Sequence, residues 1–425
     1  MKKILALVCI TALLCGCSDK NNSKSSSGGS AANNQASGNN AATEATTDDI
    51  IPEATGEQGI DTSYEAPVIG NEIDMSNVEN VSWSSLYRSA LNDFKKSENF
   101  SEAARFSIYD INDDKIPELI ISYGSSDDKT YLIRSLNIDN TYTEFEPITK
   151  CGDLLYGMKR SLLATYKYDY ENQVQDVQIY RLKNSKLANV YTFQMTSNEC
   201  KVNGQVVSDD QYNEEYNNLF DGFIKSMGTD HSFDDDIINA ALGEMDDWKE
   251  AFCAVLTDYL KYKKKYDNNF YSLMDINGDE IPELFVSGGA PYAPYVDVYA
   301  WNGCPVPVGS FGTDGTILYY PEKNLLLTEY DNPSYSAGSF YSFNNVYKFE
   351  AGISYGNNEN SKKQDENVTV VYKINGEETD KSTYEKTVKE SKKGKAYVLG
   401  LDNDVTEENI KALKEGKYTK PSEKK

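Results

Sequence analysis

The sequence contains one acidic stretch twice, as FSIYDINDDKIPELIISYG at residues 106–124 and as YSLMDINGDEIPELFVSGG at residues 271–289. Eleven of the nineteen aligned positions are identical, at a constant shift of 165 residues. In both copies an alternating apolar segment precedes and follows a polar loop, which is the pattern of a strand, a loop and a second strand. Similarity at a fixed shift indicates an internal repeat, so the stretch predicts one structural unit written twice.

The repeat extends beyond the acidic stretch in both directions. Upstream, Trp83 aligns with Trp248 at the same shift, and downstream residues 202–212 align with residues 374–384 at a shift of 172. Loop insertions in a tandem duplication produce such a drifting shift. The expected units are residues 78–243 and 244–420.

Each expected unit shows the same order of hydrophobic periodicities. It opens with apolar residues at helical spacing, from Trp83 to Phe94 in the first copy and from Trp248 to Tyr259 in the second. Short Tyr-rich and Ile-rich segments with alternation follow, broken by turn residues, and a second amphipathic helix comes after them. The pattern predicts an α+β fold of two tandem repeats, each an antiparallel β-meander with flanking amphipathic helices.

The repeated loops carry oxygen-bearing side chains at alternate positions. Aspartate, asparagine, aspartate and glutamate occupy loop positions one, three, five and nine, and the backbone carbonyl of position seven is also available. This spacing lets a tight loop direct hard oxygens at one cation, and three carboxylates with an amide suit Ca²⁺ better than a thiophilic metal. The expected calcium ligands are Asp110, Asn112, Asp114, Ile116 and Glu118 in the first loop, and Asp275, Asn277, Asp279, Ile281 and Glu283 in the second.

These loops resemble the calcium loops of bacterial surface modules of the VCBS and FG-GAP type, and more distantly those of dockerins and EF-hands. An EF-hand would need a bidentate glutamate at loop position twelve, where this chain has Ile121 or Val286. Position six, usually glycine because its backbone takes a positive φ, is Lys115 or Glu280. The alternative is a metal-free turn in which Asp and Asn accept backbone N–H bonds. Calcium is favoured for the second loop, whereas Lys115 places a cation beside the ligands of the first and leaves both alternatives open there.

The N-terminus has the pattern of a targeting segment. Two lysines precede an apolar run at residues 4–14, which is too short to span a bilayer as a permanent helix. The tetrapeptide LCGC at residues 14–17 resembles the lipobox of bacterial lipoproteins, in which a cysteine thiol carries diacylglycerol after cleavage. The resemblance implies that residues 1–16 are a signal peptide and that Cys17 is the lipidated N-terminus. An ordinary secretory signal is the alternative.

The segment after the leader is expected to be a disordered linker, residues 17–77. Its first part, residues 18–49, contains no Val, Ile, Leu, Met or aromatic residue and is rich in Ser, Asn, Gly and Ala. Such a composition cannot offset the entropy lost on ordering the backbone. We therefore expect a protein that is held at the cell membrane by a lipid on Cys17 and faces the outside of a bacterial cell.

Charge and motifs exclude several classes of function. Lys+Arg 42 against Asp+Glu 67 give a formal net charge of −25, which repels nucleic acid and makes it a poor partner. The single histidine, His231, lies in a polar stretch, and the chain has no nucleophile elbow, P-loop or dinucleotide fingerprint. We expect His231 on a surface loop and assign no catalytic residue.

Four cysteines lie in the expected units: Cys151, Cys200, Cys253 and Cys304. Outside the cell they could form disulfides, and the pairs Cys151–Cys200 and Cys253–Cys304 would keep each bond within one unit. None of the four has a cysteine at the equivalent position of the other repeat, so free buried thiols are an equal alternative.

Aromatic residues follow the second loop closely: Tyr292, Tyr295 and Trp301. Exposed rings beside a rigid metal loop would form a stacking platform for a glycan or a protein, but the favoured alternative is that Tyr295 simply begins the next strand. We expect a non-enzymatic scaffold that binds an extracellular ligand or partner. The alternative is an extracellular hydrolase, directed at glycans, that uses acidic residues of the second unit.

Overall fold

The structure is a computed structural model of the chain. It describes residues 83–424 apart from short gaps at 113, 115, 126–127, 138–140, 158–160, 170, 184–185, 220–223, 264–268, 291–292, 312–316, 332–335, 344–348 and 361–368. The expected leader, Cys17 and the expected linker therefore lie outside the described residues. Residues 83–243 are called the first half below, and residues 244–424 the second half.

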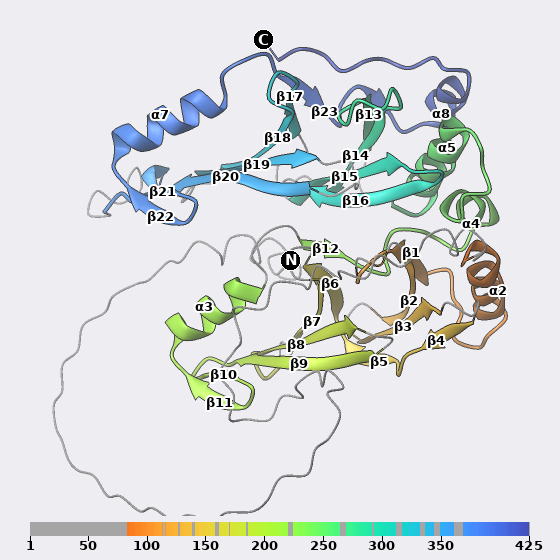
Figure 1. The fold of residues 1–425 in the computed structure, drawn as a ribbon, viewed down its shortest axis with the longest axis horizontal. Helices are drawn as coiled ribbons and strands as arrows, with labels where there is room; N and C mark the ends of the chain where they lie inside the picture. The colour runs from red at the N-terminus through yellow and green to blue at the C-terminus, as the bar shows by residue number, and fades with distance from the viewer. Residues whose placement is uncertain are drawn as a thin grey trace, which may run out of the picture.

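Two antiparallel sheets form the body of the first half (Figure 1). The five-stranded sheet has the order β1-β2-β3-β4, with β5 also paired to β3, and the seven-stranded sheet has the order β11-β10-β9-β8-β7-β6-β12. The strands are β1 (Arg105–Tyr109), β2 (Glu118–Ser125), β3 (Asp128–Leu136), β4 (Tyr142–Glu144), β5 (Ile148–Cys151), β6 (Asp153–Gly157), β7 (Leu162–Asp169), β8 (Val174–Lys183), β9 (Lys186–Met195), β10 (Cys200–Val202), β11 (Gln205–Val207) and β12 (Ile224–Ser226).

The second half repeats this arrangement, with a five-stranded sheet in the order β16-β15-β14-β13-β24 and a seven-stranded sheet in the order β22-β21-β20-β19-β18-β17-β23. A mixed fold dominated by antiparallel sheets, as expected, is confirmed. The strands are β13 (Phe270–Met274), β14 (Glu283–Ala290), β15 (Ala293–Trp301), β16 (Pro305–Phe311), β17 (Ile317–Tyr320), β18 (Leu325–Asp331), β19 (Ser336–Phe343), β20 (Phe349–Asn357), β21 (Tyr372–Ile374), β22 (Glu377–Thr379), β23 (Tyr397–Leu399) and β24 (Asn403–Asp404).

Helices lie beside these sheets because their apolar faces need cover. The first helix of each half buries the residues that show helical spacing, among them Leu91 and Leu256, against the five-stranded sheet. The side chain of Asp247 caps the first helix of the second half, Trp248–Asp258, by accepting the Lys249 N–H at 2.9 Å. The helices are α2 (Trp83–Lys95), α3 (Asp209–Leu219), α4 (Asp235–Ala241), α5 (Trp248–Asp258) with the π-helical turn η3 (Tyr259–Lys263), α7 (Lys381–Ser391) and α8 (Glu407–Lys414).

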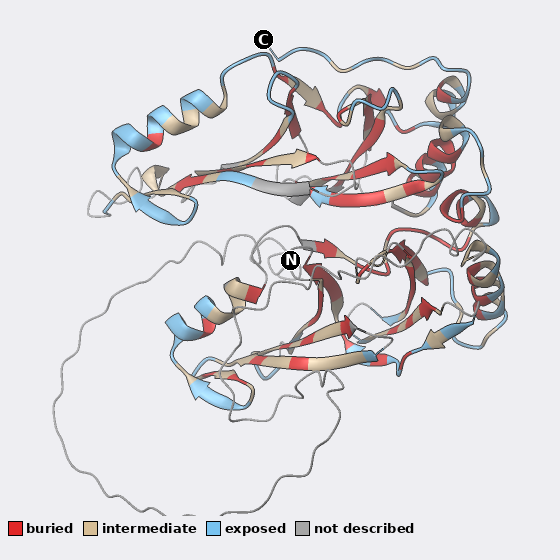
Figure 2. Cartoon of the chain, in the orientation of Figure 1, coloured by how far each residue is buried: buried red, intermediate tan, exposed pale blue. Residues whose placement is uncertain are grey.

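The two halves share one hydrophobic core. A single buried cluster includes Tyr109 and Met227 of the first half together with Val296 and Val308 of the second. Strand β16 lies against β12 and β1, so the second half covers the ends of the first-half sheets (Figure 1). Figure 2 shows the buried residues on the strands of both halves and on the helix faces turned toward them. The apolar burial between the halves predicts that they unfold together.

The expectation that His231 lies on a surface loop is wrong, because the polar stretch around it pairs with a strand. The His231 N–H and C=O bond to the backbone of Phe106 at 3.0 and 2.9 Å, which adds the residue to the edge of β1. The side chain is only 1% exposed, and its ring lies 5.2 Å from the Phe106 ring and 6.4 Å from that of Tyr299 in the second half. His231 is therefore part of the contact between the halves.

A buried ion pair accompanies His231. The Lys225 Nζ lies 2.7 Å from Asp230 Oδ1, and the two side chains are 5% and 9% exposed. Burial alone would raise the pKa of Asp230, but the Lys225 ammonium and the neighbouring imidazole outweigh it and hold that pKa below its ordinary value. The ammonium also lies 5.8 Å from the centre of the Tyr109 ring, so an aromatic ring contacts the ion pair as well.

The four cysteines named above are free thiols in the structure, which is the second of the two alternatives. Cys151, Cys200 and Cys253 are buried, and Cys304 is partly buried. Burial raises the pKa of the Cys151 and Cys253 thiols to about 11, so both are poor nucleophiles at neutral pH.

Replacing Lys225 by Met should destabilise the protein by about 3–5 kcal/mol, because it leaves the Asp230 carboxylate buried without its counter-charge. Urea unfolding at pH 7 measures this loss. Lys95→Met is the control, since Lys95 pairs with Asp235 at 2.8 Å but that carboxylate is 81% exposed, and about 1 kcal/mol or less is expected. A loss at Lys225 no larger than at Lys95 would contradict the assignment.

The same pair predicts a pH dependence. The folded pKa of Asp230 lies below its unfolded value of about 3.9, so its stabilisation is complete above that value and is lost as the pH falls through the folded pKa. The difference in unfolding free energy between the wild-type protein and Asp230→Asn should therefore be present at pH 5 and shrink as the pH falls below about 4. A difference that grows on acidification would contradict this sign.

Candidate functional site

The two acidic loops connect the first two strands of each five-stranded sheet. The first joins β1 to β2, with Tyr109 paired to Glu118, and the second joins β13 to β14, with Met274 paired to Glu283. Both are strand-loop-strand elements rather than the helix-loop-helix of an EF-hand. Loop position nine is therefore also the first residue of the returning strand.

A buried glutamate closes each loop. Glu118 Oε2 accepts the Ile111 N–H at 2.9 Å, and Glu283 Oε2 accepts the Ile276 N–H at 2.8 Å. The two glutamates are 0% and 1% exposed. Each bond joins loop position nine to position two, so the entry and the exit of the loop are held together from the inside of the protein.

The remaining oxygens of the second loop accept backbone N–H groups. Asp275 accepts from Gly278 at 2.7 Å and from Glu280 at 3.1 Å, Asn277 accepts from Asp279 at 3.0 Å, and Asp279 accepts from Ile281 at 2.8 Å. These are the Asx turns of the metal-free alternative. They also leave a lone pair on each oxygen, so the same bonds orient the side chains without using up their capacity as ligands.

The first loop is built in the same way. Asp114 N–H donates to Asp110 at 3.2 Å and to Asn112 at 3.1 Å, and Ile116 N–H donates to Asp114 at 2.8 Å. Ile116 and Ile281, whose carbonyls are the expected backbone ligands, thus take the same place in their loops. Lys115 lies outside the described residues.

The backbone of the second loop takes the left-handed region at two positions, with φ of 81° at Gly278 and 72° at Glu280. Loop position six, Glu280, thus adopts the conformation that usually selects glycine. A non-glycine residue with this backbone conformation costs roughly 1 kcal/mol of folding free energy. The side chains of Asp279 and Glu280 are exposed, so solvent reaches the outer side of the loop.

The two loops differ in how the buried glutamate is satisfied. In the first half, the Ser135 hydroxyl donates to Glu118 Oε1 at 3.0 Å. The strand register pairs Leu119 with Arg134 and Leu284 with Tyr299, so Ala300 stands where the first half has Ser135. The second glutamate thus lacks the hydroxyl that the first one has.

The consequence is a buried oxygen, Glu283 Oε1, that has no hydrogen-bond partner among the described residues. Burial, reinforced by the nearby Asp279 and Asp275 carboxylates, raises the pKa of Glu283 to about 8. Burial also raises the pKa of Glu118 well above its ordinary value, with Asp114 acting in the same direction. A cation at the second loop would satisfy this oxygen and offset the mutual repulsion of the three carboxylates.

Within the part of the chain that the structure describes, no three His, Cys, Asp or Glu side chains are gathered closely enough to form a metal site. The loop carboxylates are turned to their own amides instead. The donor set itself fits calcium, since it consists of hard oxygens only and includes one buried oxygen that needs a partner.

The aromatic residues after the second loop lie on β15 where they are described. Tyr295 pairs with Gly288, and its ring lies over that glycine, whose added Cβ would meet it at 3.0 Å. Trp301 packs in the apolar cluster under α5, with its ring 6.4 Å from Phe252. Tyr292 lies outside the described residues. Both described rings are partly buried, and the platform stays a prediction.

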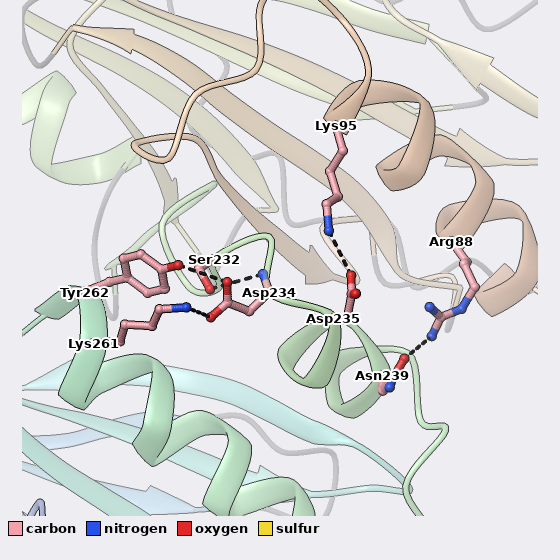
Figure 3. Close-up of polar contacts among 8 residues, drawn as sticks. All are labelled: Arg88, Lys95, Ser232, Asp234, Asp235, Asn239, Lys261 and Tyr262. Atoms are coloured by element: carbon pink, nitrogen blue, oxygen red, sulfur yellow. Dashed lines mark hydrogen bonds and ion pairs between the residues drawn. The ribbon is translucent and has the colours of Figure 1, made fainter.

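Sequence reasoning did not identify an acidic cavity of about 380 Å³ between α4, α5 and α8. Two of its acids are engaged by neighbouring side chains: Asp234 accepts from Lys261 at 2.7 Å and from Tyr262 at 2.9 Å, and Asp235 pairs with Lys95 (Figure 3). These bonds tie α4 to α2 of the first half and to η3 of the second. The run of three aspartates at residues 234–236 was the available signal.

Comparison of the chain with protein-family models, with curated proteins and with solved structures gives no match.

Proposed function

We propose that the chain is a lipid-anchored protein of the bacterial cell surface that acts as a non-enzymatic scaffold, and that Ca²⁺ at the second acidic loop stabilises it. The observation that carries the calcium proposal is Glu283 Oε1, a buried carboxylate oxygen without a hydrogen-bond partner among the described residues. Leaving such a group unsatisfied costs about 1–3 kcal/mol or more. A divalent cation would supply both the missing contact and the missing charge.

The ligands would be Asp275, Asn277, Asp279 and Glu283 through their side chains and Ile281 through its carbonyl. The Asx bonds support this assignment, because they fix the loop side chains before a cation arrives. Calcium would add rigidity to the turn between β13 and β14 and link the stability of the second half to extracellular calcium.

The first loop is the weaker candidate for calcium. The Ser135 hydroxyl donates a hydrogen bond to Glu118 Oε1, so this buried oxygen already has a partner and does not need a cation. We propose that Asp110, Asn112, Asp114, Ile116 and Glu118 form a hydrogen-bonded turn that holds calcium more weakly than the second loop does.

The repeated strand order supports a tandem duplication of one α+β unit with later divergence. The leader and the LCGC tetrapeptide support attachment to the membrane through a lipid on Cys17. No helix in the described part of the chain is long and apolar enough to cross a membrane. A glycan or protein ligand at Tyr292, Tyr295 and Trp301 is the proposed extracellular partner, and nucleic acid is disfavoured by the net charge.

Calcium should raise the melting temperature of the chain lacking its leader and linker. The experiment compares thermal unfolding in excess EGTA and in millimolar Ca²⁺, and a ligand at 100 times its Kd adds about 2.7 kcal/mol. Asp275→Ala/Asp279→Ala should abolish the shift, and Asp110→Ala/Asp114→Ala should leave most of it. No shift in the unmutated chain would mean that both loops are hydrogen-bonded turns.

Exchanging the residues opposite the two glutamates should exchange which glutamate has a hydrogen-bond partner for its Oε1 atom. Ala300→Ser places a hydroxyl beside Glu283 Oε1, so the melting temperature in EGTA should rise and the calcium-dependent shift should shrink. Ser135→Ala removes the partner of Glu118 Oε1 and should cost about 1–3 kcal/mol in EGTA. An unchanged calcium shift in Ala300→Ser would show that Glu283 Oε1 does not contact the ion.

Membrane attachment should depend on Cys17 alone. Cys17→Ala, expressed in a bacterium that processes lipoproteins, should release the protein from the membrane fraction, because the acidic body has no attraction of its own for anionic lipid. Detergent partitioning and mass spectrometry of the N-terminus measure the anchor. Cys15→Ala is the matched control and should remain lipidated.

A further inference from the structure

The two halves have corresponding ends, each with a hydrogen bond from a glycine N–H to a serine hydroxyl. Gly228 and Gly400 both have a positive φ, 68° and 86°, and their N–H groups donate to Ser107 at 2.7 Å and to Ser272 at 2.6 Å. The alignment continues at a shift of 172, from residues 224–241 to residues 396–413. β12 therefore corresponds to β23, and α4 to α8.

In the first half this end is a docking face for the second half. β12 and β1 lie against β16, and the His231 ring lies 6.4 Å from that of Tyr299. Lys225, Asp230 and His231 are all buried there. The face thus packs against a strand of the other half.

In the second half, residues 417–424 cover the corresponding end. Lys424 N–H donates to the Ala396 carbonyl at 2.7 Å and Val398 N–H to the Ser422 carbonyl at 3.3 Å, which pairs the segment with the free edge of β23. Figure 1 shows this segment returning from α8 along the side of the second half that faces away from the first. Residues 417–424 thus cover the end of the second half that corresponds to the end of the first half covered by β16.

One side chain in particular holds the segment. Asn403, which stands where the first half has His231, donates to the Thr419 carbonyl at 3.1 Å and accepts the Thr419 N–H at 2.9 Å. This two-way bond is the one that an asparagine amide makes with an extended backbone. Lys395 adds an exposed ion pair with Glu423 at 3.4 Å.

The segment itself is only lightly attached. Tyr418 and Pro421 are partly buried, whereas the other residues from 417 to 424 are exposed. Tyr418 packs against the apolar cluster under α5, and the other contacts of the segment are hydrogen bonds and one exposed ion pair, with little further apolar burial. Such a strand can be removed without dismantling the sheets beneath it.

We propose that the outer edge of β23 in the second half is a binding site for an extended peptide strand, and that residues 417–424 are its built-in, exchangeable occupant. While bound, the segment blocks the edge of β23, an edge that would otherwise pair with another chain. This edge site is selective for a strand whose backbone N–H and C=O both reach the Asn403 side chain. This inference does not depend on calcium or on the lipid anchor.

A chain that ends at Gly416 tests the proposal by complementation. Light scattering after size-exclusion chromatography should show concentration-dependent association of this variant, and a synthetic peptide of residues 417–425 should return it to the size and melting temperature of the full chain. The same peptide with Thr419→Pro, which lacks the N–H that Asn403 accepts, should bind at least 10-fold more weakly. A truncated variant that stays monomeric with an unchanged melting temperature, or that responds equally to both peptides, would overturn the proposed strand-binding site.

A second variant covers the case in which the truncated chain does not fold. Asn403→Ala in the full chain should speed hydrogen exchange at the Lys424 and Val398 amides at least 10-fold and leave exchange in the first half unchanged. Asn409→Ala is the control, because the Asn409 side chain donates to the Asp404 carbonyl nearby, and among the described residues no hydrogen bond joins this side chain to the segment. Equal exchange in the two variants would overturn the role of Asn403.

Discussion

The fold depends on a carboxylate placed inside the protein at the end of each acidic loop. Glu118 and Glu283 begin β2 and β14, the strands that return from the acidic loops into the five-stranded sheets, and each reaches back to the amide of loop position two. This bond fixes where the returning strand begins, and hence its register with the preceding strand. A slip of one residue would turn the buried face of the strand outward. The acidic motif is therefore first a device for register, and only then a candidate for binding an ion.

The same device has different consequences in the two halves because one residue on the neighbouring strand differs. Ser135 completes the hydrogen bonding of the first glutamate, and Ala300 leaves the second incomplete. Corresponding ends have diverged in a similar way. Lys225 and His231 serve a buried contact between the halves, whereas Tyr397 and Asn403 face a segment of backbone. Residues at equivalent positions of the two halves thus differ in role because their neighbours in the structure differ.

Sequence reasoning reached the features that are written in local patterns. Trp83 and Trp248 open helices as their spacing predicted, and residues 106–124 and 271–289 form the expected strand, loop and strand. It missed the correspondence of residues 224–241 with residues 396–413, where identities are few. It also misplaced His231, because hydrophobic periodicity cannot identify a polar residue that is buried by pairing. The difference between Ser135 and Ala300 matters only once the strand register is known.

The burial of the one histidine makes the contact between the halves open to direct observation. The chain contains a single imidazole, and it lies between Phe106 of one half and Tyr299 of the other. A nuclear magnetic resonance spectrum of protein labelled only at the histidine Cε1 would contain one ring signal, shifted by the currents of the aromatic rings that enclose it. That signal would report whether the halves are joined or apart, in a molecule of this size and without any added probe.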